Sequence, residues 1–308
     1  FPWRVFALRQ LLRRHRIDLA VGVTTLPAVK LLLATVGLSI RTVVSERNYP
    51  AAKHLSLPWR WLRRLTYPWA DLHLIQTRKT GVWLRQHCAV HRQQLFPNSV
   101  TWPLPDREPV LEPDEFIAPS QPLILAAGTK ADQKGFDRLM PVFADLGRRD
   151  PDLHLALLGL APGNYHGLDQ QTWLRQLLGH DSGLQERLLM PGVSGSMARW
   201  YARATVFVLP SRYEGFPNVL LEAMAAGCAC IASDCLTGPS DLILHGENGL
   251  LMAPQATSND WAVAIAGLLA DPDQCLRLGE QASRVRERYD AACLRAEFLE
   301  ALLQLCHG

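Results

Sequence analysis

The sequence of 308 residues has no long hydrophobic run and no cysteine pair with CxxC spacing. Its apolar stretch at residues 31–40 is far shorter than the roughly 20 residues that a membrane-spanning helix needs, and no segment is typical of a signal peptide. The seven cysteines are scattered and odd in number, without the CxxC spacing of structural zinc or redox sites. We expect them to be reduced thiols, mostly packed as small apolar groups, in a cytoplasmic protein.

Acidic residues are scarce in the first third of the chain. Residues 1–105 contain 16 Lys and Arg against 3 Asp and Glu, whereas the remainder contains 16 against 26. The net charge of +3 therefore hides a basic part and an acidic part. Such a basic part is typical of contact with nucleic acid or with an anionic membrane surface, and a solvated basic face is the alternative. The chain has no helix-turn-helix, zinc-finger or RNA-stacking signature, so we expect no nucleic-acid partner.

Short apolar strands alternate with amphipathic helices, which is the pattern of parallel sheets with crossover helices in an α/β protein. A chain of 308 residues with 48% hydrophobic residues fits two folded domains. Residues 103–122 are rich in Pro, Asp and Glu and lack periodicity, which indicates a linker. The expected strands lie near residues 19–23, 42–45, 72–76, 123–127, 153–158, 205–209 and 230–233. The expected helices lie near residues 5–15, 28–36, 60–67, 77–86, 136–149, 170–178, 197–202, 219–226, 260–270, 272–289 and 292–305.

The expected domains follow from this pattern. The first covers residues 1–105, the linker covers 106–122, and the second domain covers 123–285. A C-terminal helix at 286–308 can pack back toward the first domain. Because the chain opens at Phe1 without a methionine and runs straight into a helical pattern, we expect the first domain to be incomplete at its N-terminus.

Two loops after expected strands carry unusual chemistry, and parallel sheets bind ligands beyond the carboxyl ends of their strands. The first is GTKADQKG at residues 128–135, whose glycines and lysines suit a diphosphate. Many loops of this composition bind no ligand, so this loop alone is weak evidence for a diphosphate site. Two further turns are LMPGV at 189–193, which precedes an expected helix, and TGPSD at 237–241, which follows an expected strand. The former can offer backbone groups to a nucleobase.

The second loop continues into the motif EGFPNVLLE at residues 214–222. Pro217 suits the first turn of a helix and Gly215 allows a sharp entry, so the N–H groups of Asn218 and Val219 can receive phosphate oxygens. Glu214 and Glu222 then suit the hydroxyls of a sugar and a ribose on either side of a diphosphate. The alternative is that Glu214 caps the helix and Glu222 pairs with a surface cation.

Taken together, the motifs resemble those of glycosyltransferase family 4, the retaining enzymes of the GT-B fold. The resemblance covers essentially the whole chain. SERN at 45–48 further resembles a subgroup that builds bacterial surface glycans and lipid-linked oligosaccharides, including N-acetylgalactosamine transferases. The motifs, in the order of the family, are YPWAD at 67–71, FPN at 96–98, KGF at 134–136, EGFPNVLLE at 214–222, EAMAAG at 222–227 and GENGL at 246–250.

The resemblance implies two Rossmann-like domains with parallel sheets facing a cleft, and roles for several residues. Lys134 binds the donor diphosphate, Glu214 meets the donor sugar near the reacting carbon, and Glu222 binds ribose hydroxyls. Arg47 is our candidate on the acceptor side, with a structural or solvated arginine as the alternative. The family has arginine where this chain has Thr129, so Lys130 substitutes or donor binding is weakened. The expected donor-binding set is Gly128, Lys130, Lys134, Gly192, Val193, Arg212, Gly215, Phe216, Pro217, Asn218, Val219 and Glu222.

The expected reaction moves a hexosyl or N-acetylhexosaminyl unit from a nucleoside diphosphate sugar, with UDP favoured, to a glycan or polyprenyl- or other lipid-linked acceptor. No cofactor and no metal are expected, because lysine and a helix N-terminus can stabilise the departing diphosphate. The expected location is cytoplasmic, peripheral on the inner face of the plasma membrane. An inactive donor-binding scaffold and a sugar-nucleotide epimerase of the same fold are the alternatives.

Overall fold

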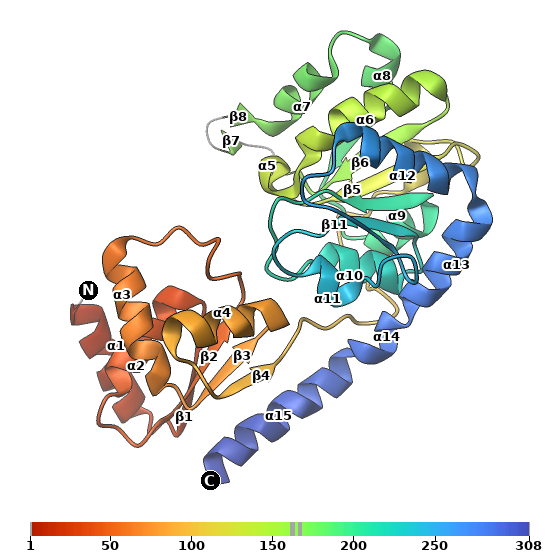
Figure 1. Ribbon diagram of the computed structural model, residues 1–308. Helices are drawn as coiled ribbons and strands as arrows, with labels where there is room; N and C mark the ends of the chain where they lie inside the picture. The colour runs from red at the N-terminus through yellow and green to blue at the C-terminus, as the bar shows by residue number, and fades with distance from the viewer. Residues whose placement is uncertain (1, 161–163, 166–167, 308) are drawn as a thin grey trace. The chain divides into compact units, whose positions relative to one another are not determined.

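The computed structural model describes residues 2–160, 164–165 and 168–307. It divides into two compact units, each with its own parallel sheet (Figure 1). The first unit comprises Phe1–Ser99, Glu214–Phe216 and Ala291–Gly308, and the second comprises Val100–Tyr213 and Pro217–Asp290. The predicted α/β class is therefore confirmed.

The first unit has a four-stranded sheet in the order β1-β2-β3-β4, and every pair is parallel. Its core joins α2 to the sheet and to α4 through Val29, Leu32, Val44 and Leu84. The strands are β1 (Leu19–Val23), β2 (Arg41–Glu46), β3 (Leu72–Ile75) and β4 (Gln93–Leu95), and the helices are α1 (Pro2–Arg14), α2 (Thr25–Thr35), α3 (Leu57–Thr66), η1 (Tyr67–Trp69), α4 (Arg78–Cys88) and α15 (Ala291–His307).

The second unit has a six-stranded parallel sheet in the order β12-β11-β10-β5-β6-β9, and a short antiparallel pair, β7 and β8. The strands are β5 (Leu123–Ala127), β6 (His154–Leu158), β7 (Asn164–Tyr165), β8 (Leu168–Asp169), β9 (Leu188–Gly192), β10 (Val206–Leu209), β11 (Cys230–Ser233) and β12 (Leu250–Met252). The helices are η2 (Pro113–Glu115), α5 (Ala131–Lys134), α6 (Phe136–Arg149), α7 (Gln170–Leu178), α8 (Ser182–Arg187), α9 (Met197–Arg203), α10 (Asn218–Ala225), α11 (Pro239–Leu242), α12 (Ser258–Ala270), α13 (Pro272–Ser283) and α14 (Val285–Arg288).

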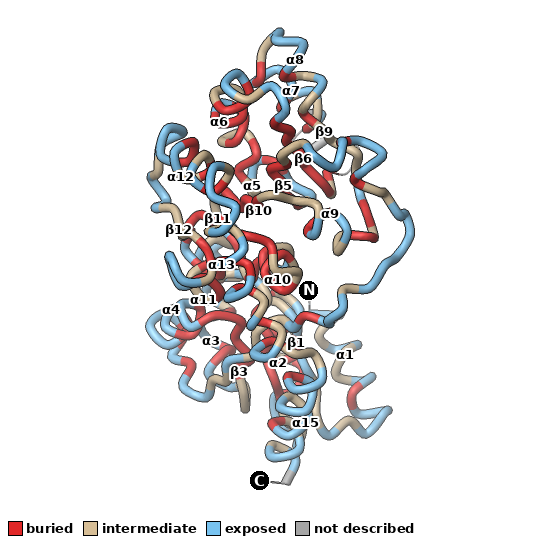
Figure 2. Tube along the Cα trace, turned by 90° about the vertical axis from the view of Figure 1, so that its right-hand side faces the viewer, coloured by how far each residue is buried: buried red, intermediate tan, exposed pale blue. Residues whose placement is uncertain are grey.

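The central strands of this sheet are buried on both faces, as Figure 2 shows for β5 and β6. Alternate residues such as Ile124 and Val208 join the core that contains residues of α6 and α12. Phe207, between Val206 and Val208, points the other way and meets Tyr201 of α9 edge-on, with ring centroids 5.6 Å apart. Because successive side chains of a strand point to opposite faces, helices must cover both, and only the strand ends are left for a ligand.

The expected strands and helices are present, with small shifts at their ends. The structure adds the strands β4, β7, β8, β9 and β12, and it divides the helix expected at 272–289 into α13 and α14. The turn expected at 189–193 is wrong, because Leu188–Gly192 is strand β9 at the edge of the sheet and pairs with β6. Four of the seven cysteines, at 88, 228, 230 and 235, are buried free thiols.

Residues 106–122 lie along the second unit. Arg107 N donates to Gly195 O at 2.9 Å, and Gly195 N donates to Pro109 O at 2.7 Å. A side chain at Gly195 would meet the backbone, since a Cβ there would lie 2.0 Å from Arg107 O. Further along, the indole N–H of Trp200 donates to Leu111 O at 2.9 Å. The Pro-rich segment is therefore part of the second unit, held there by hydrogen bonds with Gly195 and Trp200.

Among the helices that the structure describes, none combines the length and the apolar character needed to cross a bilayer.

Candidate functional site

The second sheet changes direction between β5 and β10, which are neighbours in the sheet but far apart in sequence. The chain leaves β5 toward β6 and β9 on one side, and it leaves β10 toward β11 and β12 on the other. The loops that follow these two strands diverge at this point. Open parallel sheets bind ligands in the crevice that such a divergence creates. We call residues 128–135 the β5 loop and residues 210–217 the β10 loop.

Backbone contacts hold the two loops together. Arg212 N donates to Gln133 O at 2.9 Å. Gly135 has a φ of +69° and lies so close to Pro210 that a Cβ would be 2.2 Å from the Pro210 carbonyl oxygen. A side chain at this position would therefore push the loops apart. Glycine is required here for both its conformation and its size.

Arg212, which the sequence placed among the donor-binding residues, is paired with carboxylates in the structure. Its guanidinium donates to both oxygens of Asp137, at 2.7 and 2.6 Å, and lies 3.4 Å from a carboxylate oxygen of Asp132. The hydrogen bond with Asp137 raises the pKa of Arg212. A bidentate pair of this kind fixes both partners geometrically. In this arrangement Arg212 connects the β10 loop to the β5 loop and to α6.

Three glycines mark the carboxyl ends of β5, β6 and β9. Gly128 N donates to Leu158 O at 2.8 Å, and Gly159 N donates to Gly192 O at 2.7 Å. Gly159 and Gly192 have φ values of +83° and +93°, and a Cβ on Gly159 would lie 3.4 Å from the Gly128 backbone. These three glycines contribute no side chain of their own to this end of the sheet, which favours close approach of a ligand to the backbone. The sequence prediction included Gly128 and Gly192 but missed Gly159, although it directly follows an apolar strand.

Lys134 ends α5 and lies across Gly128. A Cβ on Gly128 would be 2.6 Å from Cγ and 2.8 Å from Cε of Lys134. The absence of a side chain at Gly128 is therefore what lets the lysine chain lie over the end of β5. Lys130 is the N-cap residue of α5 and is exposed, as is the neighbouring Thr129. The β5 loop thus places two lysines where the sequence predicted a diphosphate site.

Helix α10 begins at Asn218, one residue earlier than the expected range of 219–226, and Pro217 is its N-cap residue. The first helical hydrogen bonds run from Leu220 and Leu221 to Pro217 O, at 3.0 and 3.1 Å. The N–H of Val219 therefore belongs to the N-terminal turn, where backbone donors and the helix dipole favour an anion. This helix end follows the β10 loop directly, at the divergence of the sheet.

Glu222 lies one turn inside α10 and accepts a hydrogen bond from Tyr201 Oη at 3.1 Å. Desolvation raises the pKa of Glu222, and the hydrogen bond from Tyr201 opposes that rise. Burial and the nearby Glu222 raise the pKa of Tyr201 well above its ordinary value, so the phenol is the donor. The remaining acceptor capacity of the carboxylate is suited to hydroxyl groups. No sequence signal linked Tyr201 to Glu222, because the contact joins α9 to α10.

Glu214, Gly215 and Phe216 belong to the first unit, although Tyr213 and Pro217 on either side belong to the second. Glu214 and Phe216 are both buried. The described contacts therefore assemble the β5 loop, Glu222 and the N-terminus of α10 within one unit. They also place Val193, half exposed, just after the end of β9.

Arg47 follows β2 in the first unit and is half-buried, and burial lowers its pKa. Its neighbour Glu46 ends β2 and is fully buried. The Glu46 carboxylate accepts a hydrogen bond from Thr25 Oγ1 at 2.9 Å and another from the Tyr67 hydroxyl. Desolvation raises the pKa of Glu46. This buried network ties β2 to α2 and η1 directly beside Arg47, and the sequence did not predict it.

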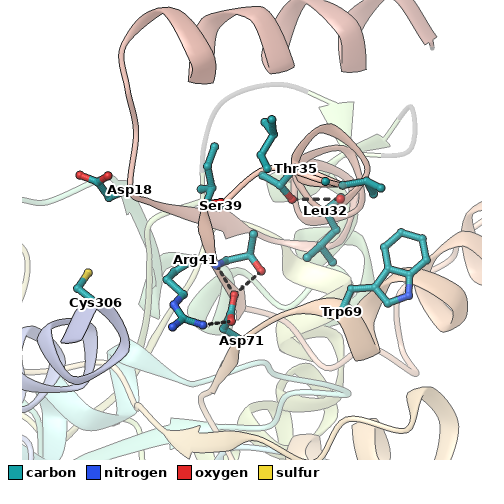
Figure 3. A pocket seen from close by; sticks show the side chains of 13 residues that line it. Asp18, Leu32, Thr35, Ser39, Arg41, Trp69, Asp71 and Cys306 are labelled. Carbon is teal, nitrogen blue, oxygen red and sulfur yellow. Dashed lines mark hydrogen bonds and ion pairs between the residues drawn. The ribbon is translucent and has the colours of Figure 1, made fainter. Parts of the chain in front are cut away.

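A pocket of about 950 Å³ lies at the opposite, amino end of the first sheet (Figure 3). Asp71 accepts hydrogen bonds there from Thr42 N at 2.7 Å and Thr42 Oγ1 at 3.1 Å, and it pairs with Arg41 at 3.3 Å. The aspartate of the YPWAD motif therefore ties the starts of β2 and β3 together. The carboxyl ends of the strands, where open parallel sheets bind ligands, lie at the other edge.

Comparison with known proteins gives consistent relationships. Residues 121–271 match the family model described as glycosyl transferases group 1. Over 94% of this chain, the sequence is 29% identical to an exopolysaccharide phosphotransferase of Streptomyces coelicolor, of which the match covers 29%. Over 82% of the chain, it is 26% identical to N-acetylgalactosamine-N,N'-diacetylbacillosaminyl-diphospho-undecaprenol 4-alpha-N-acetylgalactosaminyltransferase of Campylobacter jejuni, of which the match covers 67%. The chain spans 29%, 37% and 44% of the length of the first curated relatives it matches.

Two solved structures share the fold. Sucrose-phosphate synthase from Thermosynechococcus elongatus matches with a TM-score of 0.82 at 22% identity, over 99% of this chain and 77% of that one. HepE from Anabaena in complex with UDP matches with a TM-score of 0.84 at 19% identity, over 97% and 82%. The chain thus has the GT-B fold of these proteins, and residues 121–271, which contain the second sheet and both loops of the candidate site, are similar to the glycosyl transferases group 1 family.

Proposed function

We propose that the protein transfers a hexosyl or N-acetylhexosaminyl unit from a UDP-sugar to a glycan or lipid-linked glycan in bacterial surface polysaccharide synthesis, with retention of anomeric configuration. The observation that carries this proposal is the arrangement at the divergence of the second sheet. Lys134 lies over Gly128 at the end of β5, and the N-terminus of α10 follows β10, with Glu222 one turn inside. A cation, a helix end and a carboxylate together match a nucleoside diphosphate.

Each group has a distinct chemical task in this proposal. The ammonium of Lys134 and the N–H groups at the start of α10 hold the diphosphate, and they stabilise the charge that grows on it as the sugar leaves. Glu222 accepts hydrogen bonds from the ribose hydroxyls. Glu214 meets the sugar near the reacting carbon, and Arg47 serves the acceptor. These groups can neutralise the leaving diphosphate without a metal ion.

The relatives support this choice of substrates. The Campylobacter jejuni relative is named for transfer of N-acetylgalactosamine to a diphospho-undecaprenol-linked sugar, and the structure of HepE holds UDP. A relative in Salmonella typhimurium, 33% identical over 40% of this chain, is a lipopolysaccharide 1,6-galactosyltransferase. These names favour UDP-sugars as donors and surface glycans or their lipid carriers as acceptors.

A lipid-linked acceptor requires access to a membrane. We therefore propose that the first unit, which carries the excess of basic residues, acts at the anionic inner face of the plasma membrane. Lys and Arg near such a surface each contribute about 1 kcal/mol to binding. The acceptor-side residue Arg47 belongs to this same unit.

A donor screen tests the proposal. UDP-, GDP- and ADP-sugars are incubated with the full chain, and released nucleoside diphosphate is measured together with the thermal shift. Turnover with a UDP-sugar is expected, and Glu214→Gln should abolish most of it while leaving the melting temperature unchanged. Glu186→Gln, an exposed glutamate on α8, is the matched control and should behave as wild type.

The outcomes separate the alternatives. Binding of UDP without turnover of any donor would favour a donor-binding scaffold. Conversion of the UDP-sugar to its epimer, without net loss of the sugar nucleotide, would favour an epimerase. Wild-type turnover in Glu214→Gln would refute the assigned role of that residue.

A further inference from the structure

A cavity of about 310 Å³ lies between α3 and α4 of the first unit. Its volume is at the lower end of the range for small-ligand sites, roughly 300–1,000 Å³. The described residues that line it include no aspartate or glutamate. They are Leu57, Arg60, Trp61, Arg63, Arg64, Trp83, His87 and Cys88. The cavity is therefore rich in arginine and aromatic side chains.

Arg63 is the most unusual residue of this cavity, because it is a cation with only 5% of its surface exposed. One guanidinium nitrogen donates to Pro50 O at 3.3 Å. Its Nε is buried and has no hydrogen-bond partner among the groups that the structure describes. The buried carboxylate of Glu46 is near enough for the charge of Arg63 to oppose the rise in the pKa of Glu46, and it accepts hydrogen bonds from Thr25 and Tyr67. The unsatisfied Nε donor of Arg63 favours a further hydrogen-bond acceptor beside it.

Aromatic stacking holds the guanidinium in place. Arg63 lies over the ring of Trp83, 4.6 Å from its centroid. Trp83 also stacks on His87, with ring centroids 4.5 Å apart and planes at 8°. His87 in turn contacts the Trp83 carbonyl oxygen through Nδ1 at 3.0 Å. The cation is thus fixed in position before any ligand binds, which reduces the entropy lost on binding.

The outer surface of α3 is apolar beside this cavity. Leu57, Trp61 and Leu65 are 67%, 66% and 60% exposed. They are four residues apart, so they form one stripe along the helix. Arg60 and Arg64 are exposed and flank the stripe. A helix with an apolar stripe, a tryptophan and flanking arginines is typical of segments that lie in a membrane interface.

We propose that this cavity binds the phosphate group of an anionic phospholipid while the Leu57, Trp61 and Leu65 stripe enters the membrane interface. The inference rests on the proposed membrane location and is independent of the donor chemistry. Charge complementarity identifies the ligand, because arginines pair with phosphate oxygens through several N–H groups. The adjacent apolar stripe indicates that the phosphate belongs to a lipid, since a soluble phosphate ion would make no contact with the exposed tryptophan and leucine side chains.

Vesicle flotation of the full chain tests the proposal, with phosphatidylcholine alone or mixed with phosphatidylglycerol. The wild type should float with the mixed vesicles only. Arg60→Gln/Arg64→Gln should bind them about 30-fold more weakly. The matched control is Arg13→Gln/Arg14→Gln on α1, which removes the same charge from exposed positions of the same unit. It should lose less than about threefold, because these arginines lie outside the cavity.

Arg63→Lys distinguishes binding in the cavity from nonspecific electrostatic attraction, because it keeps the positive charge and removes the planar guanidinium group. It should weaken binding about tenfold, with circular dichroism used to check the fold. Trp61→Ala should also weaken binding, whereas Trp3→Ala on α1, a residue that is also exposed, should not. Equal losses in the two double-arginine variants, or equal flotation with both kinds of vesicle, would overturn the proposal.

Two further readouts keep this inference distinct from the proposed function. Lys134→Ala should float as the wild type does, and Arg60→Gln/Arg64→Gln should bind UDP as the wild type does in a thermal-shift assay. Donor turnover without vesicle binding would refute only the lipid site. A thermal shift with inorganic phosphate that Arg63→Lys abolishes, combined with no vesicle binding, would show that the cavity takes a soluble anion instead.

Discussion

Replacing Glu222 by glutamine tests the nucleotide site while preserving its shape. The carboxylate accepts a hydrogen bond from Tyr201 at 3.1 Å, and the amide oxygen of glutamine can accept the same bond. What changes is the charge. Desolvation already raises the pKa of Glu222, so the ionised side chain lies in an environment that disfavours its charge. We expect the substitution to weaken nucleotide binding and to increase stability at neutral pH.

The size of the binding loss follows from the proposed contact. A hydrogen bond from a ribose hydroxyl to a charged acceptor is worth about 1.5–3 kcal/mol, so the dissociation constant for UDP should rise about 10- to 150-fold. The stability gain depends on pH. Because the pKa of Glu222 is higher in the folded state, the folded state binds more protons between the two pKa values. Stability is therefore lost as pH rises through the folded pKa, and the glutamine variant avoids this loss.

Isothermal titration with UDP and urea unfolding at pH 4 and pH 7.5 measure both effects. The variant should unfold at a higher urea concentration than the wild type at pH 7.5, and the difference should shrink at pH 4. Tyr201→Phe is the companion, since removing its hydroxyl should raise the pKa of Glu222 further. When the pH is lowered, UDP binding by Tyr201→Phe should therefore begin to weaken at a higher pH than UDP binding by the wild type. Wild-type affinity of Glu222→Gln for UDP would refute the ribose contact.

Three other changes address the loops of the same site. Lys134→Ala should weaken UDP binding about 10- to 150-fold by calorimetry, because it removes a charge-assisted contact to phosphate, and unchanged affinity would contradict the assignment. Gly135→Ala should lower the free energy of unfolding by more than about 1 kcal/mol in urea, since a Cβ would lie 2.2 Å from Pro210 O at a φ of +69°. Arg212→Ala, which loses the pair with Asp137, should lower the melting temperature, and weaker UDP binding without that loss would instead favour a direct donor contact.

The fold was predictable because its pattern is local. Buried parallel strands are short apolar runs and the helices between them are amphipathic, so their order can be found from hydrophobicity alone. Two of the strands that the sequence missed, β4 and β9, lack this signal along their whole length. Strand β4 (Gln93–Leu95) carries two glutamines, and β9 contains Pro191 and Gly192, which are typical of turns. Proline is tolerated in β9 because that strand is at the edge of the sheet.

The sequence could predict residues of the candidate site only where they lie within one segment of the chain. The lysine and glycines of the β5 loop and the glutamates around α10 stand close together in sequence. Contacts between distant segments gave no signal, and they change how residues are interpreted. Arg212 was included in the expected donor-binding set, and the structure adds that its guanidinium is bound by Asp137 from α6. Tyr201 was missed because only folding brings α9 beside α10.

In the segment around α3, composition alone does not decide between two arrangements of the tryptophans and arginines, but side-chain direction does. Its tryptophans could pack inside with the arginines outside, or both could face a membrane. The helix divides them by position, since residues four apart share a face. Arg63 and Tyr67 point inward and are buried, whereas Trp61 and Trp69 are exposed. Arg63 is therefore inside and Trp61 and Trp69 are outside, the reverse of what solubility alone favours, whereas Trp59 packs against the core. This inversion is the reason to expect an anion within and a lipid surface beyond.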